Sequence, residues 1–103
     1  MYIVVLITCP GKEDGERIAN VLLKEKMAAC TNIIPQVTSY FWWTGKIHKA
    51  DESILVVKTK KSTLRKLIIK VKKIHQYENP EIIALPIIGG SKEYIKWIED
   101  EIK

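Results

Sequence analysis

The 103-residue sequence has little that would place it in a secreted, zinc-binding or membrane-spanning class. Its only two cysteines, Cys9 and Cys30, form no CxxC pair and no Cys/His cluster, which argues against a disulfide scaffold or a zinc site. The longest uncharged apolar run, residues 2–7, is far shorter than the roughly 20 residues that cross a bilayer. No basic, apolar leader stands at the start. We therefore expect a single soluble domain, residues 1–103, in the cytoplasm and without a membrane partner.

Positive charge is concentrated in one segment. The net charge is +5, yet residues 58–73 hold eight Lys or Arg and no acid, and the remainder holds nine basic against twelve acidic residues. Such a basic stripe attracts phosphate groups, although a solvated helix face is the commoner interpretation.

The first half of the chain predicts a strand, a helix and a long hairpin. The β-branched run from Tyr2 to Cys9 indicates a strand buried on both faces. Residues 13–27 have helical spacing, with acids in the first turn. Residues 29–44 and 47–59 follow as two strands that meet at Gly45.

The second half predicts two further helices around one strand. Ser62 is the expected N-cap of a helix that ends at His75. Residues 81–88 form the fourth strand, where Pro86 indicates an edge or a strand end. Ser91 caps a C-terminal helix. The resulting order, β-α-β-β-α-β-α, predicts an α+β fold of the ferredoxin-like split βαβ kind, with one added C-terminal helix.

The hairpin is too long for a monomeric globule. Residues 36–46 can extend about 36 Å, whereas a chain of this length has a diameter of roughly 34 Å. Both faces of its tip are aromatic, and they need a cover from another copy or from stacked bases. Because the strand over residues 53–60 has no aromatic on which bases could stack, we expect a homo-oligomer and no nucleic acid. The predicted interface residues are Tyr40, Phe41, Trp42 and Trp43.

Over essentially its whole length the sequence resembles the CutA proteins, which are named for divalent-cation tolerance. The resemblance is carried by short motifs that occur in order. They are Thr8-x-Pro10, Ala28-Ala29-Cys30-x-Asn32, Ser39-Tyr40, Trp43-x-Gly45-Lys46-Ile47, Glu52, Lys58-Thr59, His75-x-Tyr77-x-x-Pro80-Glu81-Ile82 and Tyr94-x-x-Trp97.

The resemblance implies a homotrimer whose long strands pair between subunits, similar in architecture to the P-II signalling proteins. It implies a role in tolerance of divalent metals, copper in particular, and no catalytic activity. The alternative is a P-II-like sensor that binds a small anionic effector in a cleft between subunits.

Copper ligands transfer poorly to this sequence. Bacterial CutA members are assigned copper through a Cys before the Thr-x-Pro motif and a His pair before the Tyr-x-x-Pro motif. Those positions are Ile7, Ile74 and His75 here, and Cys9 lies two residues from the expected Cys. We therefore expect no required cofactor, and only weak binding of Cu(II) or another divalent cation by His75 and Cys9. His75 has a second interpretation, as a charged cap at the end of its helix.

The same resemblance and strand alternation predict a cleft between subunits. Glu52 and Lys58 lie six residues apart on one strand, so their side chains share a face, and Tyr77 lies in the loop near them. An ion pair that holds the subunit register is the alternative role for the two charges. Cys30 and Asn32 complete the predicted cleft residues.

Overall fold

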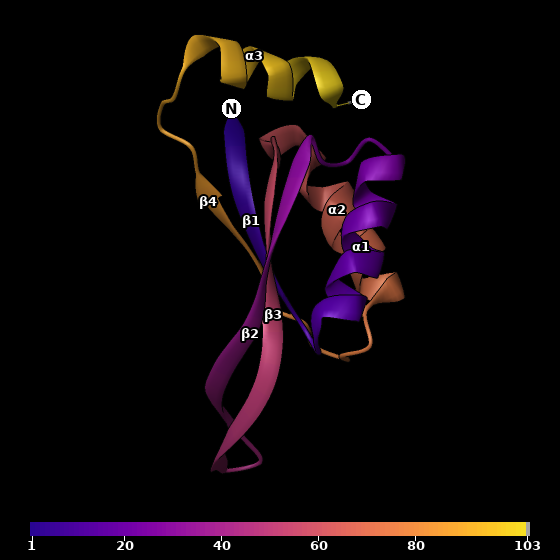
Figure 1. Cartoon of the computed structure of the whole chain (residues 1–103), viewed down its shortest axis with the longest axis vertical. Helices are drawn as coiled ribbons and strands as arrows, with labels where there is room; N and C mark the ends of the chain where they lie inside the picture. Colours follow the sequence, from indigo (N-terminus) through magenta and orange to yellow (C-terminus); the bar gives the residue numbers. More distant parts are fainter. Residues whose placement is uncertain (103) are drawn as a thin grey trace.

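A computed structural model describes residues 1–102 as one four-stranded antiparallel sheet with three helices (Figure 1). The sheet order is β2-β3-β1-β4. The elements are β1 (Tyr2–Cys9), α1 (Lys12–Lys24), β2 (Cys30–Trp43), β3 (Lys46–Lys60), the 3₁₀ turn η1 (Lys61–Thr63), α2 (Leu64–Ile74), β4 (Ile82–Pro86) and α3 (Lys92–Glu101). The predicted element order is confirmed.

The core lies between one face of the sheet and helices α1 and α2. Alternate residues of β1 are buried, from Ile3 to Cys9, and Ile7 pairs with the buried Leu55 of β3. Leu22 of α1 and Leu67 of α2 close this core. The prediction that β1 is buried on both faces is wrong for the single chain, because its other residues line a face that α1 and α2 leave uncovered. We call this second face the open face.

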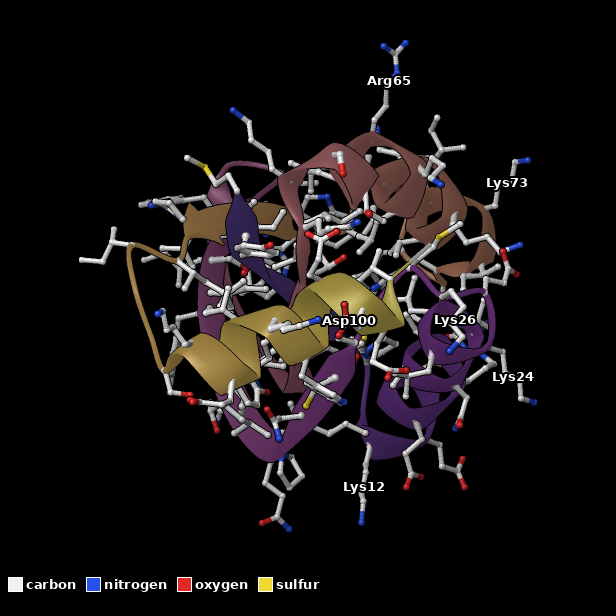
Figure 2. The ribbon with its side chains drawn as sticks, turned by 90° about the horizontal axis from the view of Figure 1, so that it is seen from above. Lys12, Lys24, Lys26, Arg65, Lys73 and Asp100 are labelled. Carbon is white, nitrogen blue, oxygen red and sulfur yellow. The ribbon has the colours of Figure 1, made fainter. Side chains whose placement is uncertain are left out.

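Helices α1 and α2 lie side by side on the core face, whereas α3 crosses the end of the sheet near the N-terminus (Figure 1). Viewed along the long axis, α3 lies over the sheet and the charged side chains of α1 and α2 radiate outward (Figure 2). Ser91 caps α3 as predicted, because its hydroxyl accepts a hydrogen bond from the Tyr94 amide.

The hairpin protrudes from the sheet and makes the molecule 44 Å long but only 25 and 22 Å across (Figure 1). Trp43 pairs with Lys46, and the turn between them has positive φ at Thr44 (52°) and Gly45 (75°). This is the backbone of a two-residue hairpin turn, as the sequence predicts. A bulge between Ile34 and Val37 interrupts the pairing of β2, which otherwise runs on as one strand, with Gln36 at φ 57°.

Two helix termini differ from prediction. α1 ends at Lys24 rather than residue 27, because Lys26 adopts a left-handed φ of 59° and the Met27 amide bonds back to the Leu22 carbonyl at 2.9 Å. Ser62 does not cap α2, because a 3₁₀ turn over Lys61–Thr63 precedes the helix and no side chain caps it.

Candidate functional site

Three of the predicted cleft residues form a polar cluster on the open face, beside α3. Lys58 on β3 lies directly opposite Cys30 on β2, and its ammonium lies 4.0 Å from the Cys30 Sγ. The same ammonium donates a hydrogen bond to the Asn32 side-chain oxygen. Helix α3 packs against β3 here. Burial, followed by the neighbouring Cys30 thiol, raises the pKa of Tyr94 on this helix. Among residues 1–102, no carboxylate forms an ion pair with Lys58.

The other two predicted cleft residues form a second group near the middle of β3, just beyond the point where its pairing with β1 ends. The Tyr77 hydroxyl donates a 2.7 Å hydrogen bond to the Oε2 of Glu52, whose side chain is buried. Burial, then the hydrogen bond and negative charge of Glu52, raises the pKa of Tyr77 well above its usual value of 10.0. Glu52 and Lys58 share a face as predicted, but six residues of strand separate them by about 20 Å. One chain alone therefore does not bring the five residues together.

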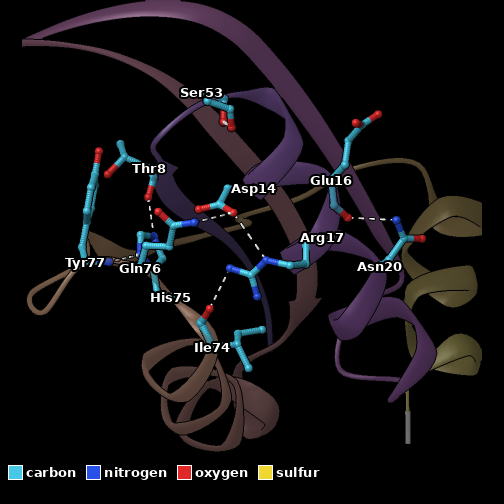
Figure 3. A network of polar contacts seen from close by, with 11 residues as sticks. Thr8, Asp14, Glu16, Arg17, Asn20, Ser53, Ile74, His75, Gln76 and Tyr77 are labelled. Atoms are coloured by element: carbon cyan, nitrogen blue, oxygen red, sulfur yellow. Dashed lines mark hydrogen bonds and ion pairs between the residues drawn. The ribbon is translucent and has the colours of Figure 1, made fainter.

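His75 connects the Tyr77 loop to the end of β1 through two hydrogen bonds (Figure 3). Its Nε2 lies 2.7 Å from the Thr8 carbonyl, and its Nδ1 accepts a 2.9 Å hydrogen bond from the Tyr77 amide. Because Nδ1 is an acceptor, the ring proton is on Nε2, which donates to Thr8. His75 is the C-terminal cap residue of α2, but the interpretation of its ring as a charged cap is contradicted, because a ring that accepts at Nδ1 is neutral.

Around this loop lies a carboxylate–guanidinium pair that sequence analysis missed. Asp14 Oδ1 accepts from Arg17 Nε at 3.4 Å and from Gln76 Nε2 at 3.2 Å, and Arg17 also donates to the Ile74 carbonyl at 2.7 Å (Figure 3). Asp14 and Arg17 sit on α1, whereas Ile74 and Gln76 flank the end of α2. No sequence signal links them, because the contact depends on how α1 packs against α2.

The aromatic tip of the hairpin is exposed in the single chain. Tyr40, Phe41, Trp42 and Trp43 all lie at the surface, and Trp42 retains 74% of its accessible area. On one face of the arm, the His48 ring stacks on Phe41 with 6.0 Å between ring centroids, and it meets Trp43 edge-on with 5.1 Å between centroids. Large aromatic groups exposed on both sides of an arm indicate a surface that another molecule covers.

Comparison with known proteins identifies the family. The family model described as CutA1 divalent ion tolerance protein matches residues 3–101. The chain belongs to the CutA1 family. It is 43% identical to the divalent-cation tolerance protein CutA of Archaeoglobus fulgidus over the full length of both chains. The solved CutA1 structure from Thermus thermophilus is 43% identical, covers all of both chains and superposes with a TM-score of 0.98.

A chloroplastic CutA 1 from Oryza sativa is 45% identical over 98% of this chain. The CutA1 chain described here spans 57% of that relative's length. The family description specifies tolerance of divalent ions and names no catalytic activity. No helix within residues 1–102 is long and apolar enough to cross a membrane.

The residues of this CutA1 protein do not fit a three-ligand copper site. Ile7 and Ile74 carry no ligand atoms, and both ring nitrogens of His75 already form hydrogen bonds. Burial, then the charge of Asp14, raises the pKa of the Cys9 thiol to about 11, so at neutral pH it lacks the thiolate that binds metals. Over the described chain, no three His, Cys, Asp or Glu side chains converge on a metal-sized position.

Tyr77 is expected to ionise at a markedly higher pH than an ordinary tyrosine. A folded-state pKa raised above 10.0 means that Tyr77 stabilises the fold fully below pH 10, and that this contribution is lost as the pH rises further. The ultraviolet absorbance of tyrosinate during an alkaline titration measures this. Tyr77→Phe should remove the step at raised pH, whereas Tyr2→Phe, which removes a tyrosine bonded to Glu99 at the surface, should leave that step intact. A titration curve whose step at raised pH survives Tyr77→Phe would contradict the assignment.

Proposed function

We propose that this CutA1 protein acts as a homotrimer in tolerance of divalent metal ions, without catalysis and without a required cofactor. The family match supports the role in metal tolerance. The observation that carries the homotrimer is the exposed aromatic arm, which extends beyond the sheet and is apolar on both faces. Partner copies laid against the arm and the open face would remove this apolar surface from water. The sheet order β2-β3-β1-β4 supports the ferredoxin-like description of each subunit.

We place the protein in the cytoplasm, which is supported by its two free cysteines. Copper binding would be weak, since His75 has no free ring nitrogen and Cys9 holds a protonated thiol. The link to metals is then indirect, through a partner or an effector rather than through a resident metal ion.

Native mass spectrometry of the metal-free protein tests the assembly. We expect a mass near three times 11.9 kDa. Phe41→Asp combined with Trp43→Asp should give monomers, because two charges would be buried without partners. Leu23→Asp combined with Ile69→Asp is the matched control, since it places the same two charges at exposed apolar positions on the helix layer, and it should leave the trimer intact. A monomeric native protein, or equal dissociation of both variants, would contradict the proposed trimer.

Titration of the same sample with Cu(II) tests the metal assignment. We expect uptake that does not saturate at one ion per chain. One tightly held copper per chain, lost in both Cys9→Ser and His75→Gln, would show a specific copper site and overturn the indirect role.

One observation favours the alternative function, a P-II-like sensor of a small anionic effector. The Lys58 ammonium lies on the face that partner copies would cover, yet its hydrogen-bond partners are the Asn32 side-chain oxygen and the Cys30 sulfur, and no carboxylate among residues 1–102 pairs with it. A cation that becomes buried needs a counter-charge, and a ligand carboxylate or phosphate would supply it. Binding of citrate or ATP to the trimer, abolished by Lys58→Ala but not by Lys49→Ala, would establish this function in place of the indirect metal role.

A further inference from the structure

The outward side of α2 forms a positively charged surface that the proposed function does not use. Leu67 and Val71 point into the core, so the opposite side of the helix faces solvent. We call these exposed residues the basic face. They are Arg65, Lys66, Ile69, Lys72 and Lys73.

The charges of the basic face are not neutralised by carboxylates of the described residues. Throughout residues 1–102, none of its four cations lies within 4.0 Å of a carboxylate, and the α2 ion pair that does form joins Lys70 to Glu25 at 2.8 Å. Figure 2 shows Arg65 and Lys73 extending away from the protein, with Lys24 at the end of α1 on the same side as Lys73. Helix α2 therefore presents a concentrated positive potential to solvent.

Ile69 lies at the centre of the basic face and keeps 51% of its surface exposed. An exposed apolar side chain within a ring of cations suits the boundary of an anionic bilayer, where the headgroups meet the cations and the isoleucine enters the acyl region. A polynucleotide offers phosphates to the same cations but no apolar layer to Ile69. We propose that the basic face is a docking surface for membranes that carry anionic lipids. The expectation of no membrane partner rested on the absence of a spanning apolar run, which docking at the surface does not need.

This surface is separate from the one assigned to subunit contacts. The basic face lies on the helix layer, whereas the open face is the other side of the sheet (Figure 1). Docking therefore does not depend on the proposed trimer, and a trimer would add further copies of the same surface.

Vesicle co-sedimentation of the full chain tests the proposal, with pure phosphatidylcholine compared with a phosphatidylcholine–phosphatidylserine mixture. We expect binding only to the mixture, and its loss at high salt. Lys66→Glu combined with Lys73→Glu should weaken binding on the order of tenfold or more, since each cation near an anionic surface strengthens attraction several-fold. Lys12→Glu combined with Lys92→Glu makes the same change in net charge at exposed positions outside the basic face, and should retain most binding.

The Ile69→Ser variant distinguishes membrane binding from polynucleotide binding. It removes the apolar group and leaves the charges, so vesicle binding should fall about threefold while its salt dependence persists. Equal binding to both vesicle types, or equal losses in the two double variants, would overturn the proposal. So would tighter binding to a DNA duplex that Ile69→Ser leaves unchanged, which would assign the basic face to nucleic acid.

Discussion

Replacing Leu55 with alanine is expected to lower the free energy of unfolding by about 3 kcal/mol. Leu55 is fully buried on β3 and lies between Ile7 of β1 and Ile33 of β2 in the sheet register. Truncation removes apolar contacts and leaves a cavity that β-strands on either side cannot close by moving.

Guanidinium unfolding at one protein concentration measures this loss, because assembly would make the apparent stability depend on concentration. Ile69→Ala is the control, since it shortens an aliphatic side chain that is half exposed on α2; its cost should stay below about 1 kcal/mol. Similar costs for the two variants would show that Leu55 does not lie at the centre of the core.

His75→Ala should cost about 3 kcal/mol as well, for a different reason. The substitution leaves the Thr8 carbonyl and the Tyr77 amide without their partners and opens a cavity where the buried ring stood. His48→Ala removes a stacked histidine from the hairpin tip and serves as the control, with an expected cost below about 1 kcal/mol.

A second readout separates loss of anchoring from loss of packing. Once the Tyr77 amide is released, the Tyr77 hydroxyl should lose its hydrogen bond to Glu52. The pKa of Tyr77 should then move down toward 10.0. Tyrosinate absorbance measures that change. A destabilised variant in which Tyr77 still titrates at raised pH would show that the loop is held by contacts other than His75.

The sequence predicts most of this fold because its local signals are strong. Alternation in β1, helical spacing in α2 and the turn at Gly45 each depend on a few neighbouring residues. The bulge at Gln36 and the helix end at Lys26 cannot be predicted in this way. Gln36 and Lys26 are non-glycine residues that surrounding contacts hold at positive φ.

The candidate site is predictable only in part. Strand alternation places Glu52 and Lys58 on one face, and the motif adds Tyr77. The pairing of Tyr77 with Glu52, and of Lys58 with Asn32, emerges only when loop and strand register are in place. The two hydrogen bonds of the His75 ring, to the Thr8 carbonyl and from the Tyr77 amide, depend on the path of the chain after α2. The sequence carries no signal for that path.

The bulge in β2 also determines on which face of the arm each later side chain of β2 lies. Ile34 pairs with Ile54 and Val37 with Glu52, so β2 advances three residues while β3 advances two. Beyond this point, odd-numbered residues of β2 occupy the face that even-numbered residues held before it. Deleting one residue there would exchange the faces on which the two aromatic pairs stand, with no aromatic residue changed. The number of residues between Ile34 and Val37 thus determines on which side of the arm Phe41 and Trp43 lie.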